Sequence, residues 1–196
     1  MAYTFNGDEY RNAKTGGERL APGGHRCIIK KITLGKSKNG KDQFVVMFDT
    51  AADDSQPCYF MNRFLDTQKW GGNYYLTAGN DYFVGNVKKL CGAIEASNDG
   101  FVAGDFSEDG STFEFRFEDI VDKEVGIVFR EEEYEPKSGI PDKWPTSAKP
   151  YYFCDVKNAQ AEPVPEIRRL EKPAAGQNGA EGFMQVRDDY EGLPFR

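Results

Sequence analysis

The sequence predicts a mainly β protein: a five-stranded barrel with one helix between the third and fourth strands, followed by a disordered C-terminal arm. Three observations predict this fold class. Five short segments are rich in β-branched and aromatic residues, as is typical of strands. One segment repeats its apolar residues at helical spacing. The last part of the chain has few residues that could form a core.

Turn residues separate the five expected strands. Glycine and proline precede the first strand, and the Asn39-Gly40 step after it is a strong hairpin signal. An alternating stretch over residues 111–117 predicts a further short strand, in an insertion between the helix and the fourth strand. The five expected strands cover residues 27–34, 43–50, 57–66, 125–130 and 149–156.

Between the third and fourth expected strands the apolar period changes to that of a helix. Phe83, Val87, Leu90 and Ile94 fall on one helical face, which predicts a helix over residues 82–94. Three strands, a helix and then two strands is the order of an OB-type barrel. An SH3-like barrel or a small sandwich also fits this order.

Length and composition suggest one domain with an appendage. The chain has 196 residues, and its hydrophobic content of 39% is low for a chain packed from end to end. Proline, glycine and alanine dominate residues 159–182, although residues 164–170 could still dock on the barrel. We therefore expect an OB-type domain over residues 1–158, a flexible linker over 159–182 and a separate tip over 183–196.

Several functional classes are disfavoured. No apolar stretch approaches the roughly 20 residues of a membrane helix, and the N-terminus does not look like a secretion signal, so we expect a cytoplasmic protein without a membrane partner. The four cysteines lack paired spacings, so we expect buried free thiols, no metal and no cofactor. No nucleotide-binding, serine-hydrolase or zinc-protease motif occurs, so we do not expect an enzyme. A nuclease that holds Mg²⁺ on clustered acids such as Asp105, Glu108 and Asp109 is the enzymatic alternative.

The charge is unevenly distributed. The net charge of −7 opposes binding to phosphates, but residues 25–42 carry six cations against one acid. Residues 99–135 are strongly acidic, and the run at residues 131–133 is the densest. This distribution predicts one basic working face and one repelling face. A solubilising surface with chance clustering is the alternative.

Lysines and aromatic rings concentrate where an OB barrel binds single strands, on strands two and three and in the loops that join strands 1–2 and 4–5. Such binding needs cations along the phosphates and rings that stack on bases. Phe44, Phe60 and Phe64 are expected in the core, whereas stacking and structural roles are both open for Trp70, Tyr74 and Trp144. Tyr75 belongs to the same aromatic segment after the third expected strand. The candidate residues for binding single-stranded DNA are Lys30, Lys36, Lys38, Lys41, Phe48, Tyr59, Arg63, Lys69, Trp70, Tyr74, Lys143, Trp144 and Tyr152.

The C-terminus combines acids with an apolar Leu-Pro-Phe step. The apolar side chains could enter a pocket on a partner while the acids meet its basic rim. A solvated tail without a role is the alternative. The candidate docking residues are Asp188, Asp189, Glu191, Leu193, Pro194 and Phe195.

This ending resembles the tail of bacterial single-stranded-DNA-binding proteins, in which an OB domain and a linker lead to acids that close on Pro-Phe. In that family the tip recruits replication, recombination and repair enzymes, so the resemblance implies that role for residues 188–195. Two features depart from the pattern. Tyr190 and Gly192 interrupt the acids, and Arg196 follows Phe195.

The body of the chain resembles phage replication-module proteins that bind single-stranded DNA, through residues 20–24, 93–98, 125–134 and 163–170. The resemblance implies a phage origin and work in the bacterial cytoplasm. We therefore expect a protein that binds and protects single-stranded DNA, without strong sequence preference, during phage replication or recombination. The hypothesis of a single-stranded-DNA-binding protein also allows several copies of the chain to form a homo-oligomer. The alternative function is an acidic protein-interaction module or inhibitor without DNA affinity.

Overall fold

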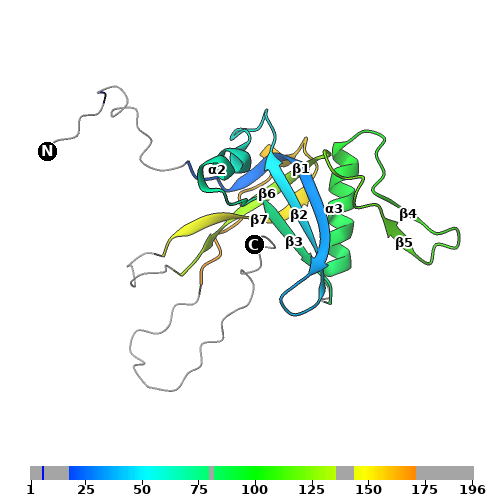
Figure 1. Cartoon of the computed structure of the whole chain (residues 1–196). Coiled ribbons are helices and arrows are strands. Elements are labelled where there is room, and N and C mark those ends of the chain that lie inside the picture. The colour runs from blue at the N-terminus through cyan, green and yellow to red at the C-terminus, as the bar shows by residue number, and fades with distance from the viewer. Residues whose placement is uncertain (1–5, 7–17, 80–81, 136–143, 171–196) are drawn as a thin grey trace, which may run out of the picture.

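The computed structural model describes residue 6 and residues 18–79, 82–135 and 144–170. The described chain is mainly β and contains a five-stranded antiparallel sheet in the order β3-β2-β1-β6-β7 (Figure 1). In chain order the elements are β1 (Gly23–Lys36), β2 (Asp42–Thr50), α2 (Tyr59–Thr67), β3 (Asn73–Thr77), α3 (Phe83–Ser97), β4 (Gly104–Phe106), β5 (Phe113–Phe115), β6 (Glu124–Glu133), β7 (Thr146–Cys154) and the 3₁₀ helix η1 (Ala159–Ala161).

The sheet has Greek-key order. β1, β2 and β3 are sequential neighbours, and β6 returns after a long connection to lie beside β1. The long strand β1 pairs with β6 through residues 23–28 and with β2 through residues 27–36. The register with β2 shifts between Ile29 and Lys31, which makes Lys30 the extra residue of a β-bulge. Because a bulge bends its strand, β1 can serve both halves of the sheet.

Most of the expected elements are confirmed. The segments expected as the first, second, fourth and fifth strands fall largely within β1, β2, β6 and β7. The expected helix is α3, and it extends three residues beyond the predicted end at Ile94. The strand expected in the insertion is β5, which pairs with β4 in a hairpin that projects from the body (Figure 1).

The expected third strand at residues 57–66 is wrong, because this segment forms the helix α2 and the third strand of the sheet is β3. Two side chains from the end of β2 satisfy the first amides of the helix. The Asp49 carboxylate accepts a hydrogen bond from the Phe60 amide at 2.8 Å, and the Thr50 hydroxyl accepts one from the Tyr59 amide at 2.8 Å. Helix N-termini need such acceptors, and here they come from a distant part of the chain.

The core lies between the inner face of the sheet and the two longer helices. Phe48 from β2 and Phe129 from β6 are fully buried, and Phe60 from α2 packs against both rings. Leu90 and Ile94 give α3 its buried face. Burial of each such side chain stabilises the fold by about 1.5–3 kcal/mol.

The packed part of the chain continues beyond residue 158, where the sequence places the start of a linker. Ala159 in η1 is fully buried, and the Arg168 amide donates a hydrogen bond to the Glu131 carbonyl at 2.8 Å. The Glu133 amide donates to the Arg168 carbonyl at 2.9 Å, so Arg168 forms a parallel bridge with Glu132. We call residues 159–170 the C-terminal segment. Residues 159–170 are therefore packed and not a flexible linker, and residues 164–170 dock as the sequence left open. Residues 171–182 lie outside the described chain.

All four cysteines are free thiols, of which Cys27 and Cys91 are buried, and Cys58 and Cys154 are partly buried. Burial is the main cause that raises the pKa of Cys91 to about 11 and that of Cys154 to about 12. At neutral pH these two side chains are therefore protonated packing groups. No helix in the described chain has the length and apolar character needed to span a membrane.

Candidate nucleic-acid interface

The strands β1, β2 and β3 present one face away from the core. The register aligns Lys31, Met47 and Asn73 in one cross-strand row, and Thr33, Val45 and Tyr75 in the next. All of these side chains are at least partly exposed. We call the surface made by these rows the outer face, and its members are Lys31, Thr33, Gly35, Gln43, Val45, Met47, Asn73, Tyr75 and Thr77.

Tyr75 is the aromatic residue of the outer face. It is 41% exposed and lies opposite Val45 in the register. Partial burial raises the pKa of its hydroxyl, and a hydrogen bond with Asn73 opposes that shift. The surface therefore combines a tyrosine ring with apolar and amide neighbours, which are the groups that can stack on a base and contact its edge.

Lysines surround this surface. Lys30 occupies the bulge of β1, and Lys38 is exposed in the loop that joins β1 to β2. Within residues 18–79, 82–135 and 144–170, neither Lys31 nor Lys38 forms an ion pair. Lys36 pairs with Asp42 at 2.6 Å. Cations without a fixed partner are available to phosphates, and each phosphate they neutralise adds salt-dependent affinity.

The loop that joins β1 to β2 also touches the chain that follows β3. The Lys41 ammonium donates a hydrogen bond to the Gly79 carbonyl at 3.5 Å. A side chain at Gly79 would lie against the Lys41 side chain, so the two segments are adjacent. The basic loop is thereby held at the β3 edge of the sheet.

The candidates between β2 and β3 lie outside the outer face. Arg63 donates a hydrogen bond to the Tyr59 hydroxyl at 3.1 Å, so the expected pair exists on a helix instead of a strand. Lys69 is exposed, while Trp70 is half-buried and donates from its indole nitrogen to the Gly72 carbonyl at 3.0 Å. The Trp70 ring also contacts Phe64, which gives it a packing role.

Two aromatic candidates are corrected because their rings are buried. Phe48 has no exposed surface and packs edge-on against Phe60 and Phe129. Strand alternation places it with Val46 on the inner face. Trp144 is only 9% exposed, so its ring is not open to a base. Lys143 lies outside the described residues.

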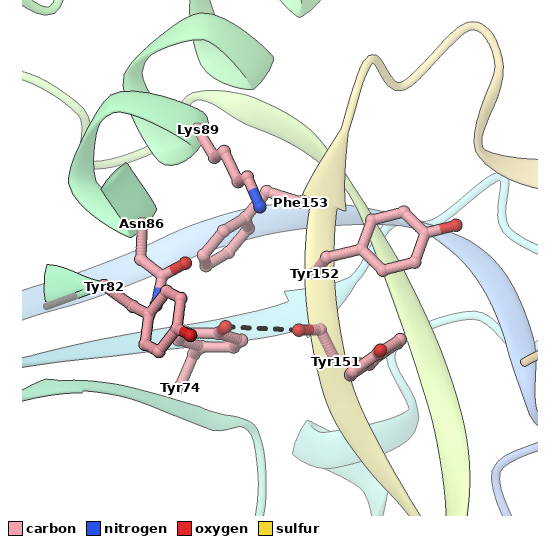
Figure 2. Close-up of a pocket in the computed structure, with 7 residues that line it drawn as sticks. All are labelled: Tyr74, Tyr82, Asn86, Lys89, Tyr151, Tyr152 and Phe153. Carbon is pink, nitrogen blue, oxygen red and sulfur yellow. Dashed lines mark hydrogen bonds between the residues drawn. The ribbon is translucent and has the colours of Figure 1, made fainter. Parts of the chain in front are cut away.

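Tyr74 points to the opposite side of β3 from Tyr75 and lies at the seam between β3 and β7, the two edge strands of the sheet. Its hydroxyl donates a hydrogen bond to the Tyr151 carbonyl at 3.2 Å, and its ring centre is 4.5 Å from that of Phe153 (Figure 2). A groove of about 490 Å³ opens here, and we call it the seam groove. It is lined by Tyr74, Tyr82, Asn86, Lys89, Tyr151, Tyr152 and Phe153.

The candidate Tyr152 is also at the seam groove. In Figure 2 its ring lies across β7 from Tyr74 and Phe153, and it packs against the Tyr151 ring with 5.4 Å between the ring centres. The Tyr152 hydroxyl donates a hydrogen bond to the Glu162 carboxylate at 3.0 Å. Burial and the contact with Glu162 raise the pKa of Tyr152 to about 12. Tyr152 thus connects β7 to the C-terminal segment.

Part of the expected repelling face is paired. Glu132 contacts Arg130 at 2.6 Å and Arg168 at 3.6 Å, and Glu133 contacts Arg169 at 3.3 Å. Glu133 is only 7% exposed. The densest acidic run of the sequence therefore anchors the C-terminal segment.

The candidate set from the sequence omitted Tyr75 and Lys31, which the register places on the outer face. Finding them needed the strand β3 and its pairing with β2, and the five-residue Asn73–Thr77 segment gives only a weak strand signal. The proposed docking residues Asp188, Asp189, Glu191, Leu193, Pro194 and Phe195 lie outside the described chain.

Among the described residues, no group of three or more His, Cys, Asp and Glu side chains is arranged to hold a metal ion. Comparison of the sequence with known families finds no matching family model, and comparison with curated proteins finds no significant match.

Proposed function

We propose that this protein has an OB-type fold and binds single-stranded DNA on its outer face. The Greek-key order, with α3 between the third and fourth strands of the sheet, supports the fold assignment. A sheet with this strand order closes into a barrel when its two edge strands, β3 and β7, come together. The hydrogen bond from Tyr74 to Tyr151 and the ring contact of Tyr74 with Phe153 already connect these two strands.

The observation that carries the functional proposal is the outer face itself. It carries Tyr75 on β3 and Lys31 on β1, in neighbouring cross-strand rows, with Lys38 in the adjoining loop, and these are the kinds of ring and cation that single strands require. The outer face spans strands two and three of the sheet and is continuous with the loop between strands one and two, which is the usual binding surface of an OB barrel.

In this proposal the protein is not an enzyme, and it coats and protects single-stranded DNA during phage replication or recombination in the bacterial cytoplasm. The tip at residues 183–196 recruits replication and recombination proteins. The resemblances of the body and of the tip support these roles, and single-strand binding on the outer face is the part that the geometry supports directly.

The rival function, an acidic protein-interaction module without DNA affinity, receives less support. It relies on the densest acidic run, at residues 131–133, in which Glu132 and Glu133 are engaged by three arginines. It also leaves the exposed lysines at positions 31 and 38 without a role.

The test is fluorescence anisotropy of a labelled oligothymidylate, titrated with the protein at several salt concentrations and with duplex competitor. We expect single strands to bind preferentially, and the slope of log affinity against log salt to be about −0.7 for each phosphate contact. Tyr75→Ala should weaken binding at least about 5-fold, the loss expected for one stacked base. Phe113→Ala is the control, because Phe113 on the projecting hairpin is 42% exposed, against 41% for Tyr75.

A lysine pair makes the test sharper. Lys36 and Lys157 have equal side-chain exposure of 64%, and each pairs with one aspartate. Lys36→Ala should weaken binding and reduce the salt slope, whereas Lys157→Ala should do neither. Equal effects of the two substitutions, or no binding even at low salt, would overturn the proposed function.

A further inference from the structure

We infer that the seam groove is a nucleobase site, which receives one base of the bound strand while Lys89 contacts the adjacent phosphate. This inference rests on the proposed function and extends it to a second surface, distinct from the outer face. The groove lies between β3, β7 and the first turns of α3 (Figure 2).

The floor of the groove is aromatic and fixed. The Tyr74 and Phe153 rings lie 4.5 Å apart at 47°. The bond from the Tyr74 hydroxyl to the Tyr151 carbonyl holds the tyrosine ring in place. A ring that is already ordered loses little conformational entropy when a base packs against it.

The wall on α3 is polar. Tyr82, Asn86 and Lys89 follow one another at helical spacing, so all three reach the groove from one side of the helix (Figure 2). The Asn86 amide offers both a donor and an acceptor to a base edge. Lys89 is the charged residue of the lining, and its ammonium can bind a phosphate.

The rim carries a further ring. Tyr151 is 44% exposed, and the Arg130 guanidinium lies 4.2 Å from its ring centre. This cation–π contact orients the Tyr151 ring, which lies across β7 from Tyr74 and Phe153 in Figure 2. The volume of about 490 Å³ falls within the usual 300–1,000 Å³ of a site for a small planar ligand.

The position of the groove favours nucleic acid as its occupant. Tyr74 and Tyr75 are adjacent on β3, an edge strand, and they point to the groove and to the outer face respectively. A strand that lies on the outer face therefore reaches the groove by crossing one sheet edge. The contact of Lys41 with Gly79 places the basic loop at this edge.

The experiment maps the bound strand by photo-cross-linking. An oligothymidylate that carries 5-iododeoxyuridine at single positions is irradiated with the full-length protein, and the linked peptides are identified by mass spectrometry. We expect links to Tyr82 or Tyr151 in the groove as well as to Tyr75 on the outer face.

A lysine substitution provides an independent measurement. Lys88 and Lys89 are adjacent exposed residues of α3, but only Lys89 lines the groove. Lys89→Ala should make the salt slope shallower by about 0.7, the value for one phosphate contact, and Lys88→Ala should leave it unchanged. Asn86→Ala should weaken binding to a mixed-base oligonucleotide and leave thermal unfolding close to that of the parent protein.

The outcomes separate the inference from the proposed function. If DNA binds and cross-links at Tyr75 only, and Lys89→Ala behaves as Lys88→Ala does, the groove is not a base site and the proposed function stands. If the protein does not bind the oligonucleotide at all, the proposed function fails and the inference fails with it.

Discussion

The buried His25 and Asp54 side chains are in contact, with 2.8 Å between the ring Nδ1 and the carboxylate. The ring Nε2 lies 3.0 Å from the Ala21 carbonyl, so both ring nitrogens face acceptors. The Arg26 and Gln56 amides also donate to Asp54. One carboxylate thus ties the start of β1 to the loop that precedes α2.

This carboxylate should make stability depend on pH. Burial raises the pKa of Asp54, but hydrogen bonds from His25, Gln56 and Arg26 outweigh burial and lower it overall. Because the folded pKa lies below the unfolded value of about 4, the stabilisation is present above that value and is lost as the pH falls through the folded pKa. We expect the free energy of unfolding to fall below about pH 4, measured by urea unfolding from pH 2.5 to 7.

Substitution of Asp54 tests whether its carboxylate causes this pH dependence of stability. Asp54→Asn should lower the free energy of unfolding by about 1–3 kcal/mol at pH 7 and remove this part of the acid dependence, because an amide cannot replace both carboxylate oxygens, of which one accepts from the Arg26 amide and the other from the Gln56 amide. Asp53→Asn is the control, since Asp53 is 61% exposed and pairs with Arg26 at the surface. Its cost should stay below about 1 kcal/mol. If the two variants share one pH profile, Asp54 is not the titrating group.

The sequence alone does not predict which of two neighbouring tyrosines lies on the outer face. Tyr74 and Tyr75 are both tyrosines in a polar context, and composition cannot distinguish them. Pairing with β2 places Tyr74 in line with the buried Val46 and Tyr75 in line with Val45. A shift of one residue exchanges the two faces of a strand, so the choice depends on the register.

At the scale of elements, α2 shows how a distant contact overrides a local pattern. Its aromatic residues suggest a strand, yet Phe60 and Phe64 are four apart and fall on one side of a helix. Asp49 and Thr50, from the end of β2, accept hydrogen bonds from its first amides. The long strands and α3 could be predicted because their periodicity is local and sustained.

The contact between β1 and η1 depends on a glycine. A Cβ atom at Gly24 would lie 1.7 Å from the Ala159 carbonyl oxygen, whereas a Cβ atom at Gly35 in the same strand would meet nothing within 4 Å. Gly24→Ala should therefore displace η1 and lower the free energy of unfolding by about 1–3 kcal/mol. Gly35→Ala should change it by less than about 0.5 kcal/mol. Urea unfolding of both variants tests this, and equal midpoints would contradict the close contact.

At the scale of the whole molecule, the C-terminal segment completes the folded body. It packs on β1 through η1 and pairs with β6 through Arg168. The Glu133 carboxylate accepts a hydrogen bond from the Leu170 amide at 3.1 Å and contacts Arg169. The composition of residues 159–182 suggested a linker in which only residues 164–170 could dock, because the few residues that make these contacts are dispersed among proline and alanine.

Limited proteolysis can test this attachment. Trypsin needs an extended chain free of partners, and the backbone of Arg168 is bonded to β6 on both sides. Glu133→Ala should increase the rate of cleavage after Arg168 and Arg169 several-fold in the folded protein. Glu135→Ala, at an exposed position two residues along the chain, should leave the rate unchanged. Equal rates in both variants would show that Glu133 does not hold the segment.

The pairing of β1 with β6 also has a consequence for biosynthesis. Gly23 is hydrogen-bonded to a strand whose residues follow about a hundred positions later, and translation at roughly 5–20 residues per second takes about 5–20 s to reach them. During that interval the nascent chain holds the apolar side of β1 without its permanent neighbour. A ribosome-bound chain that stops before residue 124 should therefore engage chaperones, whereas one in which residue 170 has left the exit tunnel should release them.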